Sequence, residues 1–158
     1  MTDHQATCAL EFGGALPSQL FIFELERLLG HDALKITSNG PFDLYSQLQK
    51  ASKQHRSASV TFHLLEGGLH ALDEIVLLLD NAGLYFRYTL TFITQTGVIC
   101  SKVNEEGVFH LTLVNDKPMF SFDELKELSK DNVLDMNKVQ KQVHVAYEIQ
   151  LPALQLPK

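Results

Sequence analysis

The chain is poor in cysteine, which excludes one class of small secreted proteins. Only two cysteines occur among 158 residues, too few for a scaffold held together by several disulfides. Cys8 and Cys100 both lie inside alternating apolar segments, a position typical of buried thiols in a reducing compartment. We therefore expect a cytoplasmic protein whose thiols belong to its core.

Basic residues are also scarce, and no hydrophobic run is long. Lys and Arg number 13 against 19 Asp and Glu, for a formal charge of −6. Nucleic-acid binding requires a dense basic face, so we expect no nucleic-acid partner. Residues 16–29 are interrupted by polar side chains and are too short to span a bilayer, and residues 1–7 lack the features of a signal peptide. We accordingly expect no membrane partner.

The residues that are present suit one ordinary domain. Hydrophobic residues make up 45% of the chain, and 10 of them are Phe. A chain of this length, within the roughly 100 to 200 residues of a typical domain, can bury one core. Charge rises from residue 115 onward, so we predict a core domain over residues 1–114 and a C-terminal segment, 115–158, packed on it.

Hydrophobic periodicity predicts the order of the elements. Period-two alternation predicts strands at 6–12, 33–37, 59–65, 84–94, 97–103, 108–114 and 143–151. Helical spacing predicts helices at 17–29, 41–53, 69–81 and 131–141, and a capping-box pattern of Ser121 with Glu124 predicts one more, ending near 129. Residues 38–41 are expected to form a turn and residues 104–107 a hairpin loop.

A weak internal repeat suggests the topology. Gly13-Gly14 precedes the first predicted helix and Gly67-Gly68 the third, so each unit is strand, Gly-Gly, helix, Gly, strand. Two right-handed βαβ units build a ferredoxin-like sandwich. We predict an α+β fold of this duplicated ferredoxin-like kind, with helices mainly on one face. Its antiparallel sheet is extended by the 97–114 hairpin and by the C-terminal strand. A chance match of the glycines is the alternative.

Two histidines and a carboxylate are the nearest approach to a metal site. His63, Glu66 and His70 flank the second glycine pair, and zinc accepts such ligands. Their spacing differs from the helical His-Glu-x-x-His pattern, in which both histidines share one helix face. The simpler interpretation leaves His63 on the polar side of a strand and pairs His70 with Asp73 or Glu74. We predict no bound metal and no cofactor.

The remaining motifs have structural explanations. Lys50, Lys53, His55 and Arg56 form the one basic cluster, and cations at a helix C-terminus complement the helix dipole. Neither glycine pair continues into a phosphate-binding motif, so both are interpreted as tight strand-to-helix turns. No serine lies in a nucleophile elbow, and no activating motif surrounds either cysteine. Positive sequence support for catalysis is therefore lacking.

Polar side chains of several strands are expected to share one sheet face. The set comprises Glu11, Thr61, His63, Arg87, Thr89, Thr91, His110 and Thr112. Within it we select Glu11, His63, Arg87 and His110 as candidates for binding a small anionic ligand or for acid–base chemistry. The alternatives are a solvated surface or a subunit interface. For Arg87, we favour an ion pair with Glu11 over an open ligand site.

Two hypotheses about function follow. The first is a non-catalytic binding or regulatory domain acting as a homodimer, because the helices at 17–29 and 69–81 and the long strand 84–94 carry more apolar residues than one small sheet covers. The second is a small-molecule enzyme or anion-binding protein using His63, Arg87 and His110 on the open sheet face.

Overall fold

The computed structural model of the protein describes residues 6–37, 42–115 and 117–157. It is an α+β structure, as predicted. The helices are α1 (Gln19–Leu29), α2 (Leu44–Lys53), α3 (Gly68–Asn81), α4 (Phe122–Glu127) and α5 (Met136–Tyr147). The strands are β1 (Ala6–Ala15), β2 (Leu34–Ile36), β3 (Ala58–Leu64), β4 (Tyr85–Phe92), β5 (Thr96–Lys102), β6 (Phe109–Val114), β7 (Lys117–Met119), β8 (Ser129–Lys130), β9 (Val133–Leu134) and β10 (Leu154–Gln155). The turn predicted at residues 38–41 lies outside the described residues.

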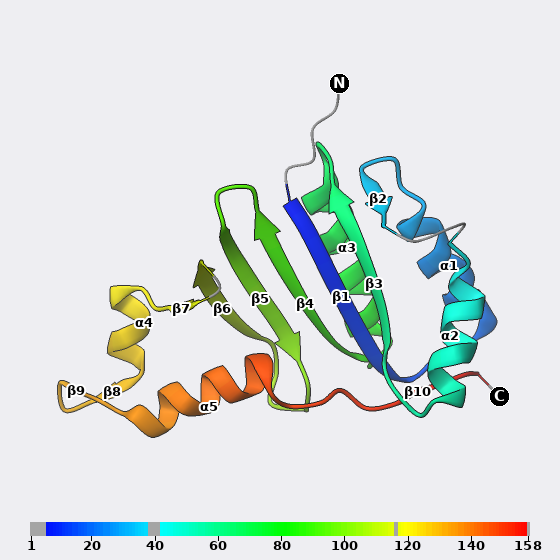
Figure 1. Ribbon diagram of the computed structural model, residues 1–158. Coiled ribbons are helices and arrows are strands. Elements are labelled where there is room, and N and C mark those ends of the chain that lie inside the picture. The colour runs from blue at the N-terminus through cyan, green and yellow to red at the C-terminus, as the bar shows by residue number, and fades with distance from the viewer. Residues whose placement is uncertain (1–5, 38–41, 116, 158) are drawn as a thin grey trace.

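Most strands form one sheet in the order β2-β3-β1-β4-β5-β6-β7 (Figure 1). Every neighbouring pair along that path is antiparallel. The short β10 adds a parallel pairing to the end of β1, where Gly14 faces Leu154. The hairpin predicted around residues 104–107 is confirmed, because β5 and β6 pair on either side of it.

The main core lies between the sheet and three helices. α1 and α3 lie behind the sheet in Figure 1, and α2 packs beside them. The largest fully buried side chains include Phe12, Phe62 and Phe86, from the adjacent strands β1, β3 and β4. Cys8 and Cys100 are buried free thiols in this core, as predicted. Within the described part of the chain, no helix has the length and apolar character needed to cross a membrane.

The two glycine pairs do not play equivalent roles. Gly67 has a φ of +84° and precedes the first turn of α3, so the predicted tight turn is confirmed there. Gly13 and Gly14 instead continue β1 to Ala15, and the predicted turn is wrong at this position. The reason is the chain that packs against them, since a Cβ on Gly13 would lie 1.9 Å from the carbonyl oxygen of Pro152.

The C-terminal strand predicted at 143–151 is wrong, because α5 occupies most of that range. Val143, Val145 and Tyr147 do alternate, yet Val139, Val143 and Ala146 also recur with helical spacing. Asp135 decides between the two patterns, since its side chain accepts from the backbone N–H of Asn137 and caps the helix. The final strand is the short β10.

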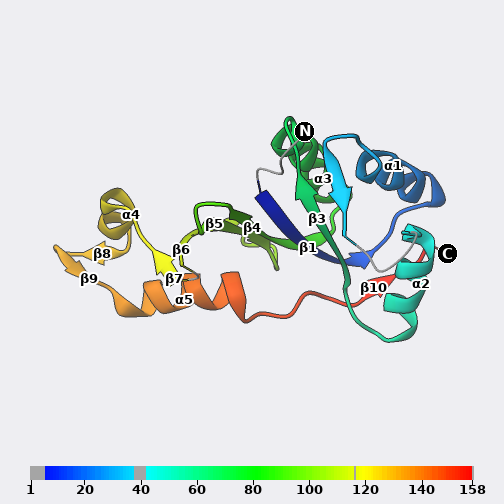
Figure 2. The same ribbon diagram turned by 45° about the horizontal axis from the view of Figure 1, so that its top comes forward.

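Two further segments, an arm and a strap, follow β6 along the chain. The arm, residues 117–141, contains β7, α4, the β8–β9 hairpin and the first part of α5, and it stands away from the main core in Figure 2. The strap, residues 148–157, runs back from α5 to β1 along one end of the sheet in Figure 1. Leu151 and Leu154 are buried in the strap, so it closes the core at that end.

Candidate functional site

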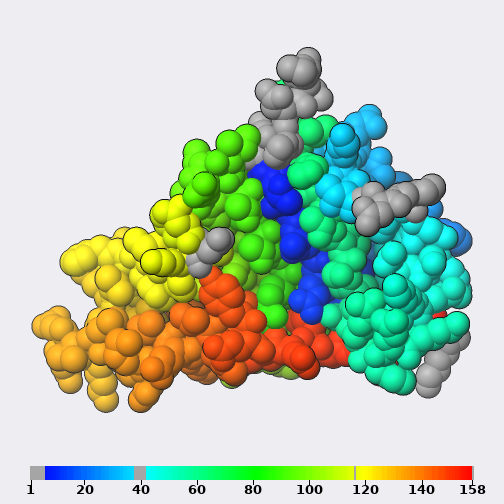
Figure 3. All heavy atoms as spheres, viewed as in Figure 1, coloured from blue at the N-terminus to red at the C-terminus, as the bar shows by residue number. Residues whose placement is uncertain are grey.

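The open sheet face is the side of β1, β3 and β4 that faces away from α1 and α3, and Figure 3 shows part of it between the arm and α2. Strand register fixes which side chains share it, since Cα partners in an antiparallel pair point to the same side. The shared face predicted for residues of these three strands is confirmed. Its members include Thr7, Glu11, Ser59, Thr61, His63, Arg87, Thr89 and Thr91.

His110 does not belong to this face, so its predicted place beside His63 and Arg87 is wrong. It pairs with Cys100, which pairs in turn with Tyr88 of the core row. The sequence pattern places the apolar residues of β6 on the side of α1 and α3, whereas they face α5 on the opposite side of the sheet. Leu111 and Leu113 are buried in that second, smaller cluster, which leaves His110 exposed on the side of the sheet that faces away from α5.

Arg87 holds the end of α5 on the sheet. Its Nη2 donates to the carbonyl oxygens of Val145 and Ile149, at 2.9 and 2.6 Å. These carbonyls lie where a helix ends with unpaired acceptors, and a cation is favourable there. Burial lowers the pKa of Arg87, while the charge of Glu11 acts in the opposite direction. Its Nε is buried without a hydrogen-bond partner.

The ion pair predicted between Arg87 and Glu11 is not formed within the described structure, although the two residues are Cα partners in β1 and β4. Glu11 Oε2 instead accepts a hydrogen bond of 2.6 Å from Ser57 Oγ. Both candidate side chains are thus engaged with other parts of the chain. The sequence pattern predicts a strand where α5 lies, so it offers no helix-end carbonyls as partners for Arg87.

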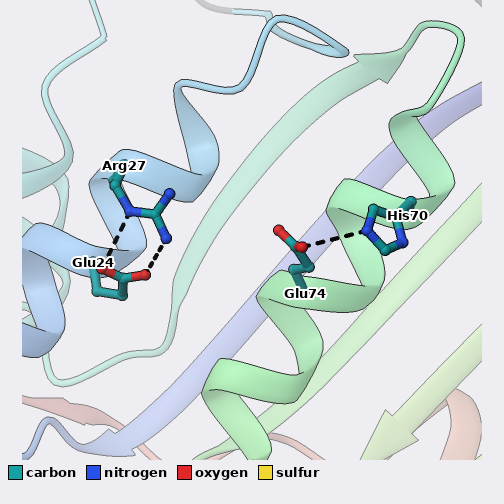
Figure 4. A network of polar contacts seen from close by, with 4 residues as sticks. All are labelled: Glu24, Arg27, His70 and Glu74. Atoms are coloured by element: carbon teal, nitrogen blue, oxygen red, sulfur yellow. Dashed lines mark hydrogen bonds and ion pairs between the residues drawn. The ribbon is translucent and has the colours of Figure 1, made fainter.

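The two histidines of the hypothetical metal set lie on different elements and have separate partners. His63 Nδ1 is 3.1 Å from Thr7 Oγ1 on the open sheet face. His70 Nε2 is 3.4 Å from Glu74 on α3, the helical pairing predicted as the simpler interpretation (Figure 4). Among the described residues, no group of three or more His, Cys, Asp or Glu side chains is arranged to hold a metal ion.

The thiols are poorly suited to nucleophilic chemistry. Burial raises the pKa of Cys8 to about 12. Burial also raises the pKa of Cys100, although a hydrogen bond from Tyr88 acts in the opposite direction. A thiol attacks as its thiolate, so both side chains are unreactive at neutral pH.

The arm is a candidate interaction site that the sequence pattern does not predict. Phe122 and Val133 are 72% and 68% exposed, and α4 buries none of its residues. The exposed large apolar side chains of the arm are Met119, Phe122, Val133, Leu134 and Met136. The sequence signal is the mixture of apolar and charged residues over this short span. The patterns at 121–129 and 131–141 predict helices that pack on the core, so they do not predict the exposure of Phe122, Val133, Leu134 and Met136.

A hollow of about 540 Å³ opens within the arm. Its lining combines apolar, charged and amide side chains from α4 and the β8–β9 hairpin: Phe122, Leu125, Lys126, Ser129, Asp131 and Asn132. Such a shape suits an apolar side chain from another molecule, because the aromatic wall gives contact area and the polar rim stays hydrated.

The shape of the arm is encoded locally. Ser121 and Glu124 form a complete capping box at the start of α4, as predicted. Asp131 and Asn132 connect β8 to β9 with φ angles of 55° and 64°, which suits a two-residue turn with a left-handed backbone at both positions. Asp135 then caps α5. Turn and cap residues therefore specify an arm that has no core of its own.

Comparisons with protein-family models, curated proteins and solved structures find no match to this chain.

Proposed function

We propose that the protein is a non-catalytic binding or regulatory domain that acts as a homodimer. The observation that carries this proposal is the arm, where large apolar side chains are exposed on an element that stands away from the main core (Figure 2). Clustered apolar surface on a folded protein commonly marks an interaction site.

The energetics of the arm support a partner. A helix as short as α4 has little stability alone in water, and an isolated two-stranded hairpin is marginal. α4 and the β8–β9 hairpin contribute no residue to the hydrophobic clusters. A surface that covers Phe122, Val133 and Met136 would supply the missing burial.

The enzyme alternative receives no comparable support from the described residues. It requires His63, Arg87 and His110 to converge, and His110 lies on the other side of the sheet. Arg87 is occupied by backbone carbonyls of α5 and of the residues that follow it. An anionic ligand would have to displace those contacts.

We also propose a ferredoxin-like topology for the sheet and a cytoplasmic location. The order β2-β3-β1-β4 supports the topology, with α1 connecting β1 to β2 and α3 connecting β3 to β4. In this proposal α2 is an insertion between β2 and β3, and β5 to β7 extend one edge. The two buried free thiols support a reducing compartment.

Light scattering on the full chain tests the homodimer. At tens of micromolar we expect a molar mass of about twice the 17.8 kDa of one chain, falling toward the single-chain value on dilution. A mass of one chain throughout the concentration series would contradict the proposal.

A further inference from the structure

We infer that the arm is a two-fold self-association surface, in which α4 of one copy lies against α5 of the second copy. This inference rests on the proposed homodimer and identifies its interface. A two-fold interface uses the same patch on both subunits, so that patch must be complementary to itself.

The charges of the arm meet that condition. α4 carries three carboxylates, Asp123, Glu124 and Glu127, against the single Lys126, for a net charge of −2. α5 carries Lys138 and Lys141 and no carboxylate, for a net charge of +2. A two-fold axis that brings α4 against the α5 of the other copy pairs opposite charges twice, because each contact is repeated by symmetry.

The apolar residues of the arm supply the area between these charged helices. Phe122 of α4, Val133 of the hairpin and Met136 of α5 are each more than half exposed in the single chain. The hollow beside Phe122 gives an apolar side chain of the second copy a place to be buried. Val133 is a suitable occupant, since it projects from the tip of the β8–β9 hairpin.

The sheet edges are less suitable for self-association. Pro118 lies in the middle of β7 and lacks a backbone N–H, and Lys117 precedes it. Lys35 lies in the middle of β2, the opposite edge, and that strand is only three residues long. Short edges that contain proline or lysine resist the addition of another strand.

The outer surface of α1 and α3 is also less suitable. It exposes Leu20, Phe23, Leu69 and Leu77, but polar contacts within the chain already occupy its middle (Figure 4). Glu24 forms an ion pair with Arg27, and His70 Nε2 lies 3.4 Å from Glu74. A subunit seated there would bury charges that already have partners and would gain no new pairing.

Two charge-reversal variants test the pairing of α4 with α5. The first carries Asp123→Lys and Glu127→Lys, leaving Glu124 in place because it completes the capping box. The second carries Lys138→Glu and Lys141→Glu; Lys141 also forms an exposed ion pair with Glu106, at 3.2 Å. The matched control is Lys50→Glu with Lys53→Glu, which makes the same charge change as the second variant, and one opposite in sign to that of the first, at the exposed end of α2.

Each arm variant is expected to dissociate at concentrations at least roughly tenfold higher than the parent, since like charges then face each other. An equimolar mixture of the two arm variants is expected to recover the dimer mass, because both contacts then pair opposite charges. The α2 control should behave like the parent. Circular dichroism spectra matching the parent establish that the variants are folded.

The outcomes separate this inference from the proposal on which it rests. A parent that stays monomeric overturns the homodimer and the arm interface together. A dimeric parent whose arm variants are equally dimeric overturns the arm interface alone. Arm variants that dissociate without recovery in the mixture overturn the pairing of α4 with α5, as does an α2 control that dissociates to the same extent.

Discussion

Arg87 shows how one side chain can fasten an otherwise loosely held helix. Only Val145 and Ala146 of α5 are buried, both in its last turn. Arg87 binds the carbonyl of Val145 and that of Ile149, just after the helix. The sheet thus holds α5 through the Arg87 guanidinium, a hydrogen bond of 3.5 Å from Ser101 Oγ to the carbonyl of Val145 and one of 3.1 Å from Gln142 Nε2 to the carbonyl of His110. The buried side chains of Val145 and Ala146 add apolar contacts.

The substitution Arg87→Ala is expected to lower the free energy of unfolding by about 1–3 kcal/mol, because a charge-assisted contact with two partly buried carbonyls is lost. Urea denaturation measures the change. Thr89→Ala, on the same strand and the same face, is the control and should have a smaller effect. An unfolding midpoint for Arg87→Ala equal to that of the parent would show that α5 is held by other contacts.

Burial of Cys8 gives a pH dependence with a definite sign. Its pKa is about 12 in the folded chain, against 9.0 for an unperturbed thiol. Below pH 9 the Cys8 thiol keeps its proton in both the folded and the unfolded chain, so the contribution of this group to the free energy of unfolding is fully present. Above pH 9 the unfolded thiol loses its proton first, and stability falls by up to about 1.4 kcal/mol per pH unit for this group.

Denaturation series between pH 8 and 11 test this effect. The Cys8→Ala variant will be less stable overall because a core group is removed, but its stability should decline less steeply with pH than that of the parent. Cys100 shares the direction of the shift, so some slope should remain. If the free energy of unfolding falls equally steeply with pH in the parent and in Cys8→Ala, the raised pKa of Cys8 is contradicted.

At the scale of elements, the close packing of the strap on β1 requires glycine at position 13. Leu16 N–H donates to the carbonyl of Gln155, and Leu154 N–H to that of Arg56, so the strap joins two distant parts of the chain. Gly13 lies directly under Pro152. Any Cβ there must push the strap away from β1.

The substitution Gly13→Ala should therefore destabilise the protein by roughly 1–3 kcal/mol or more, the range of overpacked sites. Gly30→Ala is the matched control, since its φ is −83° and its nearest contact with an added Cβ is 3.4 Å away. Thermal unfolding distinguishes them. Equal melting temperatures for the two variants would mean that the strap shifts at little cost.

The sequence predicted the elements whose patterns are unambiguous. The strand at residues 6–12 and the helix at 69–81 both match, because each has one clear apolar face. The errors at His110 and Arg87 both originate in α5. The sequence pattern predicts a strand there, so it offers no helix for Leu111 and Leu113 of β6 to pack against. His110 is therefore placed on the wrong side of the sheet, and Arg87 is paired with Glu11 in place of the helix end.

At the scale of the whole molecule, the chain divides into a buried core and an exposed arm that interrupts it. The segments on both sides of the arm belong to buried clusters. β6 contributes Leu111 and Leu113, and the segment after the arm contributes Val145, Leu151 and Leu154. The arm is therefore an exposed insertion between two buried parts of the chain, and the part that follows it returns to the sheet.

Limited trypsin digestion of dilute protein is expected to cleave first within the arm, at Lys126 or Lys130, because local opening there exposes no core residue. The two fragments should then elute together under native conditions and separate only in denaturant, since β10 stays paired with β1 and Arg87 keeps its contacts with α5. Raising the protein concentration should slow the first cleavage if the proposed homodimer forms, because a second copy would then cover the arm. First cleavage at Lys50 or Lys53 of α2, or release of the C-terminal fragment without denaturant, would contradict this division of the molecule.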